Sequence, residues 1–231
     1  MKLVFEFKKT GDLIYISHLD LARLFLRVLR MSGLKPVYSQ GFNPHPKMSF
    51  ALPLPLGLCS VCELLEFETE SALVTEAVES AVRSANERMP DGVRILSWFE
   101  KPQRISKSLA SYASAAAYEF MCDRVGGAPS LLADFFEREK VIVKKFDRKK
   151  GITSEKDIRP EMIGYRVVKD IHGRMLAEAV LSAKQGSSLN PLVFFNAFCT
   201  DSGLAAETLS PVITRTAILG SDGRPLTEKL L

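Results

Sequence analysis

The sequence predicts an α+β protein built from two ferredoxin-like α/β-sandwich halves in tandem, each with the element order βαββαβ. The first observation is that strand-like and helix-like hydrophobic periods follow one another in this order over residues 1–100. The second is that a similar order returns after residue 113. The third is the composition: 231 residues, 46% hydrophobic and 25% charged, are typical of a globular chain with room for two small domains.

The first half, residues 1–100, begins with an alternating strand. Ser17 then stands before an amphipathic helix with Asp20 three residues later, which is close to a capping box, and Gly33 follows as a C-cap. The expected elements are strand 2–8, helix 18–33, short strands 35–40 and 47–52 around a loop, strand 62–68, helix 71–89 and strand 93–100.

Residues 101–113 are rich in serine and follow neither period, so we interpret them as a linker before the second half, 114–231. In that half Asn190 and Pro191 mark a helix start and Gly203 its end. The expected elements are strand 117–123, helix 129–140, strand 141–146, a hairpin over 162–183 turning at His172–Gly173, helix 188–203 and strand 211–219.

The charge and cysteine content limit the classes of function. The formal charge of +4 permits an acidic partner such as nucleic acid without requiring one. The start of the chain lacks the apolar core of a signal peptide, and no run is apolar enough for a membrane span, so we expect a cytoplasmic protein with no membrane partner. Cys59 and Cys62 form half of a zinc site without a second half, which indicates free thiols. We expect no metal or cofactor, and metal ligation by His18, Asp20 and His45 is the alternative that their composition leaves open.

Three features carry candidate binding residues. On the first helix Leu21, Leu24, Phe25, Val28 and Leu29 share one face, and Arg23, Arg27 and Arg30 lie on the other with Asp20 at its edge. Arginine forks suit phosphates, although a solvated helix face remains an alternative. His18 lies in the first turn, where the helix dipole favours the neutral imidazole, able to act as a base or simply to hydrogen-bond a neighbour.

The second feature is the loop "SQGFNPHPKMSF", Ser39 to Phe50. Its two prolines restrict the backbone at and before each of them, so the loop is stiff and presents Asn43, His45 and Lys47 at low entropic cost. Gly41 permits a turn or the close approach of a partner. A rigid connection between strands is the alternative.

The third feature is a basic segment, residues 144–159, with seven basic and three acidic residues. It is a plausible phosphate contact or a solvated loop. Its candidate residues are Lys144, Lys145, Arg148, Lys149 and Lys150.

Sequence signatures of common enzymes are absent. The chain has no GxxxxGK[ST], GxGxxG, HExxH or GxSxG, and no CxxxCxxC for a radical iron–sulfur cluster.

The runs "YISHLDLARLFLRVLR" and "YSQGFNPHPKMSFALPLPLG" resemble the bacterial radical-SAM-linked protein family, a domain of unknown function. The resemblance continues more weakly through "KDIRP" and "TRTAIL", over nearly the whole chain. It implies importance for His18, Asp20, Arg23, Gly41, Asn43, His45 and Lys47 but no catalytic roles, and the CxxC pair departs from the family pattern.

The resemblance also implies association with a radical-SAM enzyme, and the neighbouring genes of such proteins favour RNA. We therefore expect an accessory protein, without catalysis of its own, that binds structured RNA such as tRNA or rRNA. The alternatives are a metal-independent endoribonuclease that uses His18 or His45, and a subunit that docks only to protein, using the apolar run "FALPLPLGL".

Overall fold

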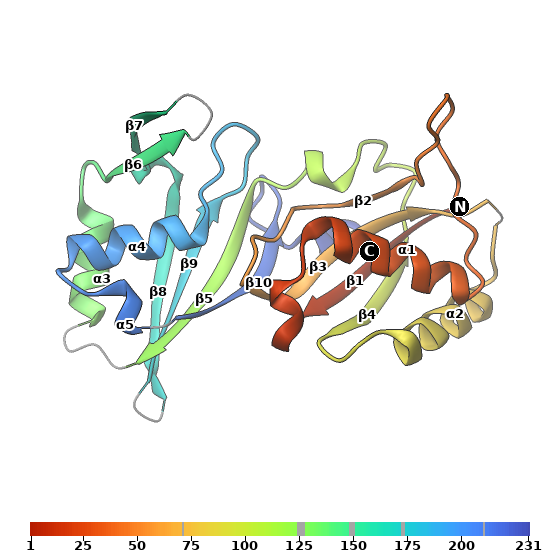
Figure 1. Ribbon diagram of the computed structural model, residues 1–231, viewed down its shortest axis with the longest axis horizontal. Coiled ribbons are helices and arrows are strands. Elements are labelled where there is room, and N and C mark those ends of the chain that lie inside the picture. Colours follow the sequence, from red (N-terminus) through yellow and green to blue (C-terminus); the bar gives the residue numbers. More distant parts are fainter. Residues whose placement is uncertain (71, 124–127, 148–150, 172–173, 210) are drawn as a thin grey trace. The chain divides into compact units, whose positions relative to one another are not determined.

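The computed structural model describes residues 1–70, 72–123, 128–147, 151–171, 174–209 and 211–231. The chain forms two compact units (Figure 1). The first comprises Met1–Ala113 and Ala217–Leu231, and the second comprises Ser114–Thr216. No helix in the described part of the chain is long and apolar enough to cross a membrane.

The first unit contains the expected βαββαβ order. Its strands run antiparallel in the order β4-β1-β3, and β2 pairs with β3, which is the strand order of a ferredoxin-like sheet. The bounds are β1 (Lys2–Lys9), α1 (His18–Met31), β2 (Met48–Phe50), β3 (Cys59–Glu68), α2 (Thr75–Arg88) and β4 (Val93–Glu100), with 3-10 turns at Gly11–Tyr15, Leu109–Ser111 and Leu226–Lys229.

One face of this sheet packs against α1 and α2 (Figure 1). Because side chains alternate along a strand, Leu3, Phe5 and Phe7 of β1 all point to that face, where they are completely buried. Phe7 lies 4.5 Å from Phe25 of α1, measured between ring centroids. The apolar face predicted for α1 is confirmed, since Leu21, Phe25, Val28 and Leu29 are buried and Leu24 packs beside them.

The opposite face of the same sheet is also covered. Val4 and Leu64 pack there against Leu109 of the segment 101–113 and Leu226 of the C-terminal segment. Sequence patterns predict a linker for the first segment and place the second in the other half, whereas both contribute to the core of the first unit. Their apolar residues lie on short turns and irregular backbone, where hydrophobic periodicity gives no signal.

The second unit repeats the arrangement, with its strands in the order β10-β5-β9-β8. Between α3 and β8 it carries an inserted antiparallel hairpin, β6–β7, which forms a sheet of its own. The bounds are β5 (Ala115–Asp123), α3 (Ala128–Glu137), β6 (Ile142–Asp147), β7 (Ile152–Asp157), β8 (Met162–Ile171), β9 (Arg174–Ser182), α4 (Pro191–Asp201), α5 (Ala206–Leu209) and β10 (Val212–Leu219), with a 3-10 turn at Arg159–Glu161.

The prediction of a tandem α+β ferredoxin-like fold is therefore confirmed, with differences in detail. The Asn190 side chain caps α4 by accepting from the Leu192 N–H at 2.9 Å, as expected. Helix α2 begins at Thr75, and the predicted start Ser71 lies outside the described residues, as does the turn at His172–Gly173. The strand β7 was not predicted, because its sequence ITSEKD is polar and mostly exposed.

Candidate functional site

The start of α1 is held by a closed set of hydrogen bonds. The Ser17 Oγ accepts from the Asp20 N–H at 3.1 Å, and the Ser17 hydroxyl donates to the Asp20 carboxylate at 2.7 Å. Arg23 donates to the other oxygen of that carboxylate at 2.9 Å. The Ser17 hydrogen bond, and after it Arg23, lowers the pKa of Asp20. Asp20 thus links the N-cap residue Ser17 to Arg23 and orients both side chains.

The outer face of α1 is basic. Arg23, Arg27 and Arg30 are all exposed, and together with Leu26 and Met31 they line a shallow hollow. Within the described part of the chain, neither Arg27 nor Arg30 forms an ion pair. Asp20 is the single acid on this helix and is already bound to Arg23. Two guanidinium forks are consequently available to an anionic ligand.

His18 connects α1 to the strand that follows the stiff loop. Its ring lies 4.9 Å from the ring of Phe50, at an interplanar angle of 65°. Phe50 in turn packs against Phe7 and Phe25, at centroid distances of 5.8 and 6.0 Å. His18 is nevertheless exposed. The aromatic contact therefore fixes where an accessible imidazole lies.

The loop 39–47 is a hydrogen-bonded projection. The Ser39 N–H donates to the His45 carbonyl at 2.8 Å, and the His45 N–H donates back to the Ser39 Oγ at 2.9 Å. The Lys47 N–H donates to the Val37 carbonyl at 2.7 Å. Gly41 has φ of +124°, a backbone conformation that other residues adopt only with strain. These contacts explain how two prolines and a glycine produce a stiff finger.

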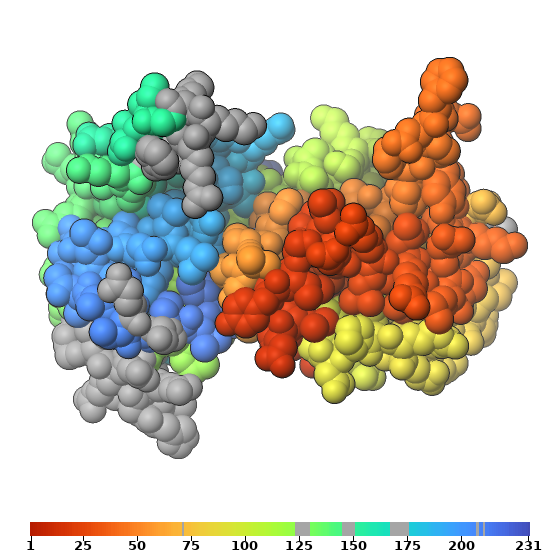
Figure 2. Space-filling view, in the orientation of Figure 1, coloured from red at the N-terminus to blue at the C-terminus, as the bar shows by residue number. Residues whose placement is uncertain are grey.

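Phe42 lies at the tip of this finger and is fully exposed, at 111% of its reference area. Figure 2 shows the orange segment of the finger projecting beyond the surface of the first unit. Asn43 and His45 beside it are also exposed. From sequence, Phe42 is one of three aromatic residues, with Tyr38 and Phe50, that could either stack on RNA bases or lie in the core, and it is not among the predicted site residues. The available signal was its position between Gly41 and Asn43-Pro44, where a core aromatic residue is unexpected.

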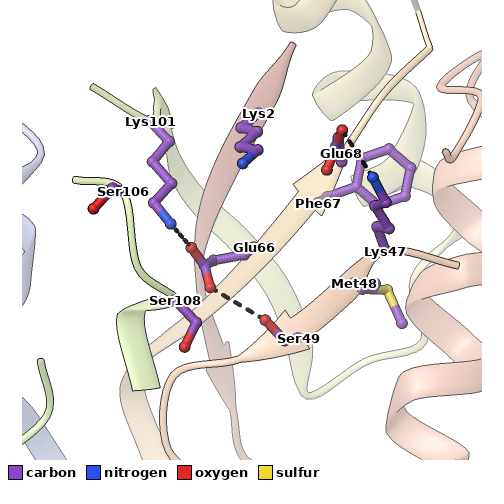
Figure 3. Close-up of a pocket in the computed structure, with 10 residues that line it drawn as sticks. All are labelled: Lys2, Lys47, Met48, Ser49, Glu66, Phe67, Glu68, Lys101, Ser106 and Ser108. Carbon is purple, nitrogen blue, oxygen red and sulfur yellow. Dashed lines mark hydrogen bonds and ion pairs between the residues drawn. The ribbon is translucent and has the colours of Figure 1, made fainter. Parts of the chain in front are cut away.

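Lys47 lines a different pocket, on the second face of the sheet (Figure 3). Its ammonium lies 3.5 Å from the Glu68 carboxylate. Nearby Glu66 pairs with Lys101 and accepts hydrogen bonds from the Ser49 hydroxyl at 3.2 Å and the Leu109 N–H at 3.0 Å. Each carboxylate has a cationic partner, so this pocket is an ion-pair network that fastens residues 101–109 to the sheet.

The basic segment of the second unit is only partly described. Lys144 is exposed on β6, and Lys145 lies on the same strand with its side chain outside the described residues. Arg148, Lys149 and Lys150 lie outside them altogether. Lys156 pairs with Glu161 at 2.6 Å, so it is a structural residue rather than a free cation.

The described residues contain no cluster of three or more histidine, cysteine, aspartate or glutamate side chains suited to a metal ion. All four cysteines are free thiols, with Cys59 and Cys62 half-buried and Cys122 and Cys199 buried. In "FALPLPLGL", Ala51 and Leu58 are buried, and Leu56 is exposed.

Comparison with known proteins places this architecture in a family. The model of one family, "Uncharacterized protein conserved in bacteria (DUF2344)", matches residues 2–191. The chain therefore belongs to this bacterial family. A search of curated proteins finds no match. Among solved structures, a chain of "Crystal Structure of a Cbf5-Nop10-Gar1 Complex" aligns with a TM-score of 0.48 at 11% identity, over 94% of this chain and 48% of that one, so this chain spans about half its length.

Proposed function

We propose that this member of the family is an accessory protein of a radical-SAM enzyme that binds structured RNA, such as tRNA or rRNA, through α1 and the finger 39–47. The RNA is the ligand and the partner enzyme performs the chemistry. This chain itself contributes no catalytic step.

RNA binding is supported by the presence of exposed arginines and an exposed aromatic ring in the same unit. Arg27 and Arg30 offer guanidinium forks that no acid in the described residues neutralises. Phe42 offers a fully exposed ring on a stiff finger. Phosphate contacts and aromatic stacking on unpaired bases are the two elements of sequence-tolerant RNA binding.

Local rigidity supports the same proposal. The Ser17–Asp20–Arg23 hydrogen bonds, the contact of His18 with Phe50 and the bonds that close the finger hold these groups in place before a ligand arrives. Ordering them on binding therefore costs little conformational entropy.

The proposed association with a radical-SAM enzyme rests on the sequence resemblance. The spacing of the four cysteines, at 59, 62, 122 and 199, does not contain the CxxxCxxC of a radical-SAM cluster. An enzyme with that cluster would have to be a separate polypeptide or domain.

The test is a salt titration of binding to a labelled tRNA. Each phosphate contact contributes about −0.9 to the slope of log K against log salt for duplex and about −0.7 for single strands. We expect Arg27→Ala/Arg30→Ala, which removes two contacts, to weaken binding and to make the slope shallower by about 1.4 to 1.8. The matched control is Arg83→Ala/Arg94→Ala, which removes two exposed arginines from α2 and β4. Equal losses in both variants, or salt-insensitive binding, would contradict the proposed interface.

The same samples distinguish the alternative functions. RNA fragments that appear with the native protein and disappear with His45→Ala or His18→Ala would indicate the endoribonuclease. An absence of RNA binding at low salt, with stable capture of a purified radical-SAM protein, would indicate the protein-only docking subunit. Intact RNA with the expected change in slope supports the accessory role.

A further inference from the structure

The second unit contains a groove that the proposed RNA interface does not use. It is lined by residues of the hairpin strand β6 and of helix α4, two elements that Figure 1 labels in the second unit. Ile142, Val143 and Lys144 line it on the strand side, and Val193 and Ala197 line it on the helix side. A groove with a strand edge along one wall and a helix along the other has the form that accepts an extended peptide.

The wall formed by β6 has unused main-chain groups. The Ile158 N–H donates to the Val141 carbonyl at 2.8 Å, so Val141 directs its carbonyl towards β7. Alternate residues of an antiparallel strand face opposite edges, and Ile142 and Lys144 therefore direct their N–H and C=O groups away from β7. Among the described residues, no main-chain hydrogen bond beyond the β6–β7 ladder engages either of them.

The opposite wall carries two apolar side chains, Val193 and Ala197, beside the polar Asn196 and Thr200. Val193 and Ala197 are four residues apart on α4, so they lie one above the other on the side that faces the groove. Val193 is 38% exposed. A bound strand would cover this surface with every second side chain.

Two lysines give the edge of the groove a positive charge, which Asp157 near Lys140 offsets in part. Lys140 and Lys144 are exposed at its edge. The acid that lines it, Asp201, lies 3.3 Å from the Arg138 guanidinium and is neutralised by it. The electrostatic preference is thus for a ligand with acidic side chains.

We propose that this groove binds an extended acidic segment of a partner protein, which adds to β6 as a third strand of the β6–β7 sheet. Main-chain hydrogen bonds to Ile142 and Lys144 hold the segment, alternate apolar side chains pack on Val193 and Ala197, and acidic residues pair with the two lysines. A second copy of the chain is a poorer occupant, because pairing two β6 edges brings lysines of like charge together. The site is in the other unit from the proposed RNA interface and does not depend on it.

The test uses a fluorescein-labelled peptide, Glu-Val-Thr-Val-Glu-Val-Asp, in a polarisation titration with the full chain. A matched peptide with lysine in place of each acid should bind at least about tenfold more weakly. Methylating one alternate set of peptide amide nitrogens should abolish binding, whereas methylating the other set should leave it. If both methylated peptides bind alike, main-chain pairing is overturned.

Variants of the protein locate the site. Lys140→Glu/Lys144→Glu should weaken binding of the acidic peptide at least about tenfold, while Lys107→Glu/Lys184→Glu, with the same change in charge on exposed lysines elsewhere, should not. Ala197→Phe fills the groove and should also abolish binding. In the complex, amide exchange should slow at Ile142 and Lys144. Unchanged exchange there, displacement of the peptide by RNA oligonucleotides, or a dimer in light scattering that Ala197→Phe abolishes would each overturn the proposal.

Discussion

A substitution at Phe42 should change the affinity for RNA without changing the free energy of unfolding. Its side chain is fully exposed, and it takes part in no ring contact among the described aromatic residues. Replacing it with alanine removes no buried surface. The free energy of unfolding of Phe42→Ala should therefore equal that of the native protein within about 0.5 kcal/mol.

The expected effect on RNA binding is much larger. Stacking of one base on an aromatic side chain contributes about 1–3 kcal/mol, which corresponds to a loss of about 5- to 140-fold in affinity. Because phenylalanine is neutral, the salt dependence of binding should stay the same in Phe42→Ala. Loss of affinity at constant salt slope is the opposite of the result expected for Arg27→Ala/Arg30→Ala.

The assay combines two variants of Phe42 with one control variant. Fluorescence anisotropy of a labelled tRNA measures the affinity of Phe42→Ala beside that of Leu56→Ala, a control that removes another exposed apolar side chain from the same unit. Phe42→Trp adds an exposed indole to a chain whose single native tryptophan is the half-buried Trp98. Stacking on a base should quench the emission of the added indole. Native affinity in Phe42→Ala together with unquenched emission in Phe42→Trp would refute the role of the finger in RNA binding.

Three further predictions concern the fold. Gly92 has φ of +96°, and a Cβ there would lie 2.4 Å from the Thr10 carbonyl oxygen, so Gly92→Ala should lower the free energy of unfolding in urea by about 2 kcal/mol or more; an unchanged midpoint would contradict the backbone contact. Burial, and after it Cys122, raises the pKa of Cys199 to about 11, so at pH 8 about one molecule in a thousand carries the Cys199 thiolate. A thiol reagent should therefore modify Cys199 only on unfolding, after the half-buried thiols Cys59 and Cys62 have reacted. Early modification of Cys199 would be inconsistent with its burial. The pKa of Asp20 is lowered, so the stability that the Asp20 carboxylate contributes is present above the ordinary aspartate pKa and is lost as the pH falls through the lower pKa of the folded state. In Ser17→Ala, NMR titration should show the pKa of Asp20 moving upwards. An unmoved titration midpoint would exclude the Ser17 hydrogen bond as the cause of the lowered pKa.

Local sequence patterns were sufficient to predict the helix ends that capping residues, glycine or proline mark. Helix α1 begins after Ser17 and ends before Gly33, as predicted. Gly33 has φ of +92°, and at this end of the helix the Gly33 N–H donates to the Arg30 carbonyl and the Leu34 N–H donates to the Leu29 carbonyl. Asn190 and Pro191 likewise begin α4. The outward placement of Arg27 and Arg30 followed from helical geometry alone.

Other features depend on contacts between distant residues. No periodicity marks Leu109 or Leu226 as core residues, because each lies on a single short turn. The polar strand β7 exists because it pairs with β6, and its own residues have little tendency to form a strand. The contact of His18 with Phe50 joins two motifs that are adjacent only in space.

The amino-acid sequence by itself determined the two βαββαβ halves, the basic face of α1 and the stiffness of the loop, because each follows from periodicity, capping or proline geometry within a few residues. The tertiary structure alone decided that both faces of the first sheet are covered, that the finger exposes Phe42, and that Lys47 and Lys156 are held by carboxylates. The local sequence around an aromatic or basic residue is the same whether its side chain is exposed to a partner or already contacts another residue of the fold. Its availability to a partner is set by neighbours that the chain brings together only on folding.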